Sequence, residues 1–396
     1  MDSPLDLAIA SVLAGRAQAG LLRRRTSWEP VGPVTVRRDG RDYVNFASNN
    51  YLGLTHHPRL LAALRAAPNV GSGAAGLISG HTDAHARAEA AIAAWKSCDA
   101  AILLPSGYQA NLAVVQTLAA VAAAVDAAPK SADNVRFLID KLAHASLLDA
   151  VRLTGQSFRI FPHNGLAKLE RLLADAPARQ TQIVLTESVF SMDGNAADLR
   201  GLAELKRRHP FVLVVDEAHG SGVYGRHGAG LIDELGVRDS VDVTVVTLSK
   251  ALGLAGAAVC ASTAFIRAIE NFGRAYIYST AVSPLTADLA TEAVAVCRDE
   301  PQHQKRLRQL AKHVRAELNG YGFTCAAGDS PIIPLNMGEP ALALAAADRL
   351  REAGLLVVAV RPPTVPPGTS RLRITVSAAH TDDQVEQLLA AIKKIA

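Results

Sequence analysis

A lysine that follows a short apolar run is the residue in this sequence best suited to covalent chemistry. Lys250 comes just after the run 243–247, V-T-V-V-T, whose length and β-branched composition indicate a buried parallel strand rather than a helix. Open α/β sheets bind ligands at the carboxyl ends of their strands, so we expect the Lys250 amine among apolar walls. Desolvation lowers the pKa of such an amine and makes it nucleophilic. The alternative, for a Ser-Lys pair that stands alone, is a lysine that reaches the surface at a strand end.

A second apolar run ends in an acid and an imidazole. Residues 211–220, F-V-L-V-V-D-E-A-H-G, place Asp216 and His219 at what we expect to be the same sheet edge as Lys250. A buried carboxylate needs a partner, and a protonated ring nitrogen would serve. A Schiff-base lysine and an acid that keeps a pyridinium protonated are what pyridoxal phosphate requires of a protein. The alternative for D-E-A-H is a nucleoside-triphosphatase Mg²⁺ motif, but the sequence lacks the G-x-x-x-x-G-K-[ST] loop that this would need.

Length and composition set the class of protein. The 396 residues suffice for one large and one smaller domain. A net charge of +4 without a Lys/Arg stripe argues against a nucleic-acid partner. The four cysteines are scattered, which suggests neither a metal site nor a disulfide framework and fits reduced thiols in the cytosol. The acidic start and the absence of a long apolar run predict a soluble, cytoplasmic protein with no membrane partner.

The strands that position these residues alternate with helical stretches. From 100 to 262 this alternation predicts a doubly wound, mostly parallel sheet. The further strands that we expect in this region are 100–104, 134–140, 158–161 and 182–186.

Two of the predicted helix starts in this region could serve a flat, phosphorylated cofactor. The helix at about 106–120 begins in S-G-Y, where the N–H groups of Ser106, Gly107 and Tyr108 could hold a phosphate. Ordinary capping by Ser106 is equally compatible with these residues. His144 follows the strand 134–140 by four residues and could stack on a flat ring. A capping or core role is the alternative for His144.

The flanking regions have different patterns. Residues 4–22 predict an amphipathic helix that could pack on another subunit, and 34–46 predict a hairpin turning at Asp-Gly. For the glycine-rich segment 71–80 a flexible loop near the substrate is favoured over a phosphate cradle. The helix after it begins at a Thr/Asp cap and covers 82–96.

After residue 280 the pattern indicates a smaller α+β domain. It begins with a long helical stretch, 284–320, broken near Glu300-Pro301, and it contains the proline-stiffened loop 361–370. Its expected strands are 332–337, 355–360 and 371–376. We therefore predict an N-terminal segment, a large α/β domain and a small C-terminal domain, with bounds 1–45, 46–283 and 284–396.

Several motifs, in order along nearly the whole chain, resemble the α-oxoamine synthases. These are fold-type I pyridoxal-phosphate enzymes with an aspartate aminotransferase-like fold. The motifs are L-R-R-R, N-N-Y-L-G-L, S-G-Y-Q-A-N, H-A-S, F-S-M-D-G, D-E-A-H-G, T-L-S-K and R-L-R-I-T-V-S-A-A-H. The resemblance implies a homodimer with its active site at the subunit boundary.

The resemblance also assigns cofactor roles. It implies that Lys250 carries the cofactor as a Schiff base, that Asp216 pairs with the pyridine nitrogen, and that His144 stacks on the ring. The remaining implied cofactor residues are Ser191 and His219 at the ring hydroxyl, Ser106, Gly107, Tyr108 and Thr247 at the phosphate, and Ser279–Thr280 at the partner subunit's phosphate.

Substrate roles follow from the same resemblance. Arg373 would bind the amino-acid carboxylate, and the residues implied to meet substrate are Arg23, Asn50, Arg361 and Thr364. The segment 361–366, R-P-P-T-V-P, resembles members that condense L-alanine with pimeloyl-CoA or a pimeloyl-carrier protein in biotin biosynthesis. The arginines at 23–25 fit a substrate tail that ends in a carboxylate.

Two alternatives remain open at this point. One is a family member that uses glycine or serine with a different acyl-CoA, and the small residues in G-S-G-A-A-G, where many relatives have G-S-R or G-S-G-H, leave the acyl pocket undetermined. The other is a transcriptional regulator with an aminotransferase-like domain. The roughly forty residues before the sheet domain are too few for its helix-turn-helix module.

Overall fold

The computed structural model describes residues 3–125, 134–177 and 179–395. Contacts divide the chain into two units, which we treat separately: 49–308, and 1–48 together with 309–396. Within the described residues, no helix is long and apolar enough to cross a membrane.

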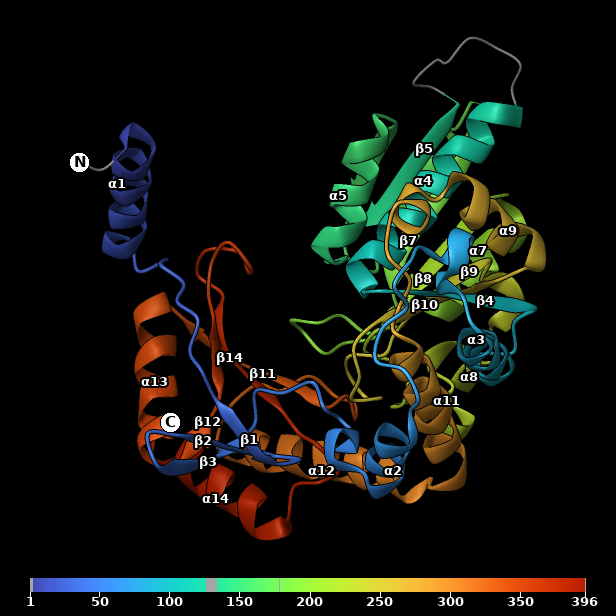
Figure 1. Ribbon diagram of the computed structural model, residues 1–396. Coiled ribbons are helices and arrows are strands. Elements are labelled where there is room, and N and C mark those ends of the chain that lie inside the picture. The colour runs from blue at the N-terminus through green and yellow to red at the C-terminus, as the bar shows by residue number, and fades with distance from the viewer. Residues whose placement is uncertain (1–2, 126–133, 178, 396) are drawn as a thin grey trace. The chain divides into compact units, whose positions relative to one another are not determined.

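The unit 49–308 is built on a seven-stranded sheet (Figure 1). In sheet order its strands are β4 (Ala100–Leu104), β10 (Ala257–Ala261), β9 (Val243–Thr247), β8 (Val212–Asp216), β7 (Thr181–Glu187), β5 (Val135–Asp140) and β6 (Ser157–Phe161). Only β10 runs against its neighbours, β4 and β9, so the predicted doubly wound, mostly parallel sheet is confirmed. The antiparallel β10 was not predicted separately.

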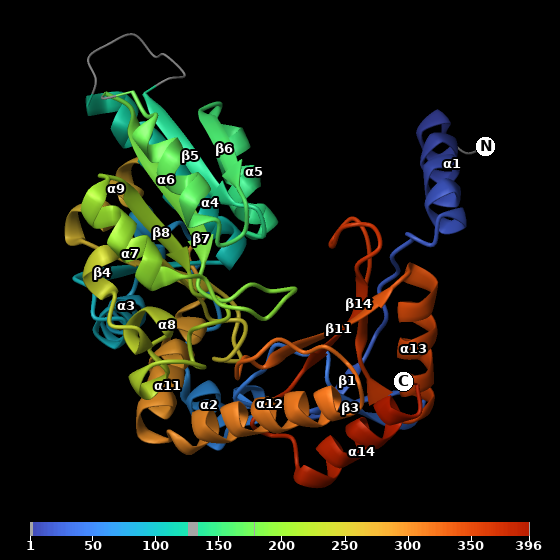
Figure 2. The same cartoon turned by 180° about the vertical axis from the view of Figure 1, so that it is seen from behind.

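Helices cover both faces of this sheet. On one face α4 (Gly107–Val125), α5 (Ala145–Thr154) and α9 (Thr263–Phe272) bury aliphatic side chains against the strands. On the other face lie α6 (Leu166–Ala174) and α7 (Leu199–Arg208), which Figure 2 shows in front of the sheet. The other helices of the unit are α2 (Pro58–Ala66), α3 (Asp83–Trp95), α8 (Leu231–Glu234), α10 (Arg274–Ile277), α11 (Pro284–Asp299) and the first part of α12 (Gln302–Gly320). As predicted, α3 begins at the capping residue Thr82 and the helical stretch after 284 breaks at Glu300-Pro301.

The glycine-rich segment 71–80 forms hydrogen bonds with residues 280–282, and its predicted place near the substrate stays a prediction. It contains a π-helical turn, Gly76–Gly80, and the Ser72 hydroxyl donates to the backbone oxygens of Ala281 and Val282. A Cβ at Gly80 would lie 2.1 Å from the backbone oxygen of Ala74. Glycine is needed at position 80 because the backbone folds back on itself there.

The second unit contains two small sheets. One has the order β1 (Glu29–Gly32), β2 (Thr35–Arg38), β3 (Arg41–Asn45), β12 (Leu355–Leu356), and the other β11 (Ile332–Gly338), β14 (Ser370–Thr375), β13 (Val358–Val360). Its helices are α1 (Pro4–Gln18), α13 (Pro340–Glu352), α14 (Asp382–Lys393) and the rest of α12.

Local predictions for this unit hold at the hairpin and fail at one strand. Asp39 and Gly40 take positive φ values of 51° and 74°, as a tight hairpin turn requires. The single strand expected at 355–360 is wrong: Leu355–Leu356 pairs with β3, whereas Val358–Val360 pairs with β14. A run of apolar residues does not show that its two halves bond to different sheets.

The contact division differs from the predicted domain bounds at both ends. Residues up to 48 group with the C-terminal part, because β3 pairs with β12 and Phe46 stacks on His380 at 4.1 Å. Helix α11 groups with the large unit instead, since it packs on α2 and α3. The division therefore falls within α12 rather than at residues 283 and 284.

Candidate active site

Lys250 lies beside a histidine and a tyrosine in the unit 49–308. Its Nζ is 2.9 Å from Nε2 of His219, whose Nδ1 is 2.5 Å from the hydroxyl of Tyr51. Tyr51 and His219 are buried, whereas Lys250 is half-buried. The imidazole can therefore orient the amine and exchange a proton with it. Tyr51 was not predicted, although it lies in the N-N-Y-L-G-L motif.

Asp216 is the last residue of β8 and is only 4% exposed. Its Oδ1 accepts from the backbone N–H of Ala218 at 2.9 Å, and its Oδ2 accepts from Nδ2 of Asn111, also at 2.9 Å. Across 49–125, 134–177 and 179–308, no basic side chain forms an ion pair with this carboxylate. A buried, oriented carboxylate without a cation is suited to a protonated pyridine nitrogen, so these residues fit pyridoxal phosphate.

His144 caps α5 and is linked to Asp216 through two side chains. Its Nδ1 is 2.7 Å from the hydroxyl of Ser146, which accepts from Nδ2 of Asn111 at 2.8 Å. Protein atoms around the ring desolvate the imidazolium and lower the pKa of His144, while the Asp216 charge acts in the opposite direction. A neutral, exposed ring is compatible with stacking on a cofactor. Asn111 and Ser146 were not predicted as site residues. The only indication in the sequence was that Asn111 lies in the motif S-G-Y-Q-A-N and Ser146 in the motif H-A-S.

The first turn of α4 lies against the end of β9. A Cβ at Gly107 would be 2.4 Å from Cγ2 of Thr247, so only glycine permits this approach. The Ser106 hydroxyl accepts from the Gln109 N–H at 3.2 Å, which is the capping role considered as the alternative. Tyr108 is 44% exposed and donates to Asp149 at 3.1 Å. The N-terminus of a helix can bind a phosphate, but this role stays a prediction for each of these residues.

Three further predicted residues have contacts that do not test their roles. Ser191 lies in the turn after β7, which closes with the Gly194 N–H donating to the Phe190 oxygen at 2.8 Å. Thr280 is exposed and pairs with the backbone of Ala75, and its neighbour Ser279 accepts from Gln109 at 3.4 Å. Asn50 is buried and donates to the hydroxyl of Thr55 at 2.8 Å.

The predicted substrate arginines lie in the other unit, where two distant segments meet. Nη2 of Arg23 donates to the Thr364 hydroxyl at 3.0 Å, and the Arg361 guanidinium donates to the backbone oxygen of Gly20. Arg373 is buried on β14 and donates to the Thr375 hydroxyl at 3.0 Å. The structure thus places Arg23 beside Thr364 and Arg361 beside Gly20, and the role of these residues in binding substrate stays a prediction.

Glu217, the second acid of D-E-A-H, has a structural environment. Its Oε2 is 2.6 Å from Nζ of Lys96, and both side chains are buried. Its Oε1 accepts from the backbone N–H of Ile232 at 3.0 Å. Because the Lys96 charge neutralises it inside the chain, Glu217 is not available to a ligand in the way that Asp216 is.

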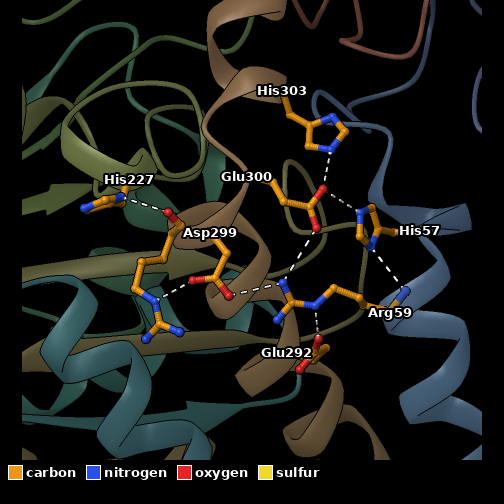
Figure 3. Close-up of polar contacts among 8 residues, drawn as sticks. His57, Arg59, His227, Glu292, Asp299, Glu300 and His303 are labelled. Atoms are coloured by element: carbon orange, nitrogen blue, oxygen red, sulfur yellow. Dashed lines mark hydrogen bonds and ion pairs between the residues drawn. The ribbon is translucent and has the colours of Figure 1, made fainter.

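Another cluster of potential ligands lies at the break between α11 and α12 (Figure 3). His57, Glu300 and His303 are near enough to one another to hold a metal ion. Oε2 of Glu300 is 3.2 Å from Nε2 of His57 and 3.1 Å from Nε2 of His303. Nδ1 of His57 accepts from the Arg59 backbone N–H at 3.3 Å, which places the ring proton on Nε2, facing Glu300. A metal-bound histidine needs the opposite tautomer, so we interpret the cluster as a hydrogen-bonded network.

Comparison with known proteins agrees with this site. The chain belongs to the aminotransferase class I and II family, whose model matches residues 41–392. It is 44% identical to the 8-amino-7-oxononanoate synthase of Anaeromyxobacter dehalogenans (strain 2CP-1 / ATCC BAA-258), covering 94% of this chain and 92% of the relative.

Two solved structures extend the comparison. One is 8-amino-7-oxononanoate synthase from Francisella tularensis, 27% identical with a TM-score of 0.73 over 89% of this chain and 97% of that one. The other is SPT (a serine palmitoyltransferase) with PLP, 25% identical with a TM-score of 0.91 over 100% and 98%. The resemblance to the α-oxoamine synthases, the fold and the pyridoxal-phosphate cofactor predicted from the sequence are thereby confirmed.

Proposed function

We propose that this protein condenses L-alanine with pimeloyl-CoA, or with a pimeloyl-carrier protein, to give 8-amino-7-oxononanoate in biotin biosynthesis. The carbon–carbon bond joins the α-carbon of alanine to the acyl carbon, the thiol leaves, and the alanine carboxylate departs as CO₂. The observation that carries the proposal is the placement of Lys250 beside His219 and of Asp216 beside Asn111. This arrangement occurs in a chain that is 44% identical to an 8-amino-7-oxononanoate synthase.

The chain's own side chains perform the proton and charge steps. Pyridoxal phosphate, when bound, supplies the sink for the electron pair left after the α-proton is removed. Lys250 Nζ takes that proton, and His219 at 2.9 Å orients the amine. Asp216, held by Asn111 and the Ala218 N–H, accepts the hydrogen bond of the protonated ring nitrogen.

Substrate and partner contacts complete the proposal. Arg373 binds the amino-acid carboxylate, and the Arg23–Thr364–Arg361 group binds the far end of the acyl chain, where a carboxylate matches guanidinium donors. The protein acts as a homodimer in which Ser279 and Thr280 reach the partner subunit's phosphate.

The second candidate is a related synthase that joins serine or glycine to another acyl-CoA. The TM-score of 0.91 to SPT with PLP favours it on backbone similarity. The greater identity, 44%, is to an oxononanoate synthase, and we give it more weight because side chains select the substrate.

Thiol release separates the two candidates. Purified holoprotein is mixed with L-alanine and, separately, pimeloyl-, acetyl-, succinyl- or palmitoyl-CoA. Release with pimeloyl-CoA alone supports the proposal. Release with another thioester, or only when serine or glycine replaces alanine, would move the protein to the second candidate and leave the cofactor assignment intact.

A further inference from the structure

Glu187 is a buried acid to which the proposed reaction gives no role. It is the last residue of β7 and is 1% exposed. Its strand lies between β5 and β8, which also end in acids, Asp140 and Asp216. Three carboxyl groups therefore end three consecutive strands at the edge of the sheet where Lys250 lies.

The outer two acids have hydrogen-bond donors for their charge. Asp140 accepts from the Leu142 N–H at 2.9 Å and from Nδ1 of His163 at 3.1 Å. Asp216 accepts from the Asn111 amide and the Ala218 N–H. Each of these two carboxylates therefore has hydrogen-bond donors within the chain.

The middle acid lacks such support. Oε1 of Glu187 has no hydrogen-bond partner among the described residues. Glu187 and Asp216 are register partners in adjacent parallel strands, so their side chains lie on the same face. Two neighbouring buried carboxylates of this kind do not both ionise readily.

The charges around Glu187 favour its neutral form. Burial is the largest influence and raises the pKa of Glu187 well above its usual range, and the Asp216 charge raises it further. Asp140 on β5 acts in the same direction. Lys250 after β9 and the His144 N–H before α5 act in the opposite direction but do not outweigh burial.

We propose that Glu187 is a neutral carboxylic acid, so that Asp216 is the single negative charge of this pair at the cofactor's ring nitrogen. The second half of this statement rests on the proposed function, whereas the protonation of Glu187 does not. Glu187 is a positioning residue, because it acts through Asp216.

Infrared difference spectroscopy of the cofactor-free protein at pH 7 tests the protonation directly. Wild type minus Glu187→Gln is expected to show the carbonyl band of one protonated carboxylic acid. The matched control, wild type minus Asp216→Asn, is expected to show carboxylate bands. Carboxylate bands in the Glu187→Gln difference would overturn the proposal. Failure of the thiol-release assay in wild type would overturn the function and leave this result standing.

The pH dependence of unfolding gives a second readout. If Glu187 is neutral in the folded state and ionised in the unfolded one, unfolding releases a proton, and rising pH favours unfolding. The quantity to measure is the unfolding constant of cofactor-free wild type divided by that of Glu187→Gln. Above the ordinary carboxyl pKa of 4.5, this ratio is expected to rise with pH by up to about tenfold per pH unit. A ratio that stays flat between pH 5 and pH 8 would contradict the proposal.

A replacement without charge gives a third readout. Glu187→Gln is expected to retain α-proton exchange within about threefold of wild type, because it exchanges a neutral acid for a neutral amide. A large loss of exchange in Glu187→Gln would overturn the neutral assignment.

Discussion

Two clusters in the unit 49–308 combine histidines and carboxylates, yet they differ in how charge is balanced. At the α11–α12 break, Glu300 accepts from His57 and His303 and lies 3.6 Å from Arg59, which in turn pairs with Glu292 at 2.5 Å. At the carboxyl ends of β8 and β9, Asp216 is buried and oriented without any described cation beside it.

The difference shows which cluster is available to a ligand. The acids around Arg59 have their counter-charges within the chain, so they stabilise the packing of α2 on α11. Asp216 is held in position by Asn111 and the Ala218 N–H, which supply hydrogen bonds but no positive charge. A buried acid of this kind marks a site completed by a cofactor.

Removing the lysine is the strongest test of the Asp216 cluster. Lys250→Ala is expected to reduce condensation by about a thousandfold or more, because both the covalent attachment and the base are lost. The control is Lys141→Ala, an exposed lysine in the same unit, which should leave the thiol-release rate unchanged. Appreciable condensation by Lys250→Ala would refute the assigned role.

Neutralising the acid comes next in size. Asp216→Asn should still bind pyridoxal phosphate but exchange the α-proton of alanine about a hundredfold more slowly, the scale of losing an oriented electrostatic partner. Exchange is followed by NMR in D₂O. A near-normal rate would mean that Asp216 is, like Glu300, a structural acid.

A smaller effect is expected at the residue that orients Asp216. Asn111→Ala removes one hydrogen bond to a charged group and should slow exchange about tenfold. In the Asp216→Asn background the same substitution should add little, since the two residues act together. Additive losses in this double-mutant cycle would place Asn111 in a separate role.

The smallest effect is expected at the paired cluster. Burial by itself raises the pKa of Glu300, but hydrogen bonds from His303 and His57 outweigh it and hold the pKa below its usual range. The ionised carboxylate therefore stabilises the fold above the ordinary pKa of 4.5, and this contribution is lost as the pH falls through the lowered value.

Urea unfolding of Glu300→Gln checks this. The variant should be about 1 kcal/mol less stable than wild type at pH 7, with the gap closing in acid and with cofactor binding unchanged. If Zn²⁺ raises the urea midpoint of unfolding of wild type but not of His303→Ala, the His57–Glu300–His303 cluster is a metal site. Asp216 would then not be the only one of the two clusters that is available to a ligand.

Much of the fold could be read from local pattern. The runs ending at Asp216 and Thr247 are uninterrupted β-branched and apolar residues, which suit strands covered on both faces. The Asp39-Gly40 turn and the Thr82 cap are likewise encoded by adjacent residues. The strand expected at 355–360 was split because its halves bond to β3 and β14, partners that no local pattern names.

The sequence by itself determined the chemistry of the site, since Lys250 and Asp216 follow buried parallel strands and such strands end at one sheet edge. Only the tertiary structure decided which side chains support them. Tyr51 reaches His219 across 168 positions, and Asn111 reaches Asp216 across 105. It also decided that Glu187 is buried on a strand between two others that end in acids. Periodicity and capping are properties of neighbouring residues, whereas the partner of a buried polar group is set by packing between distant segments.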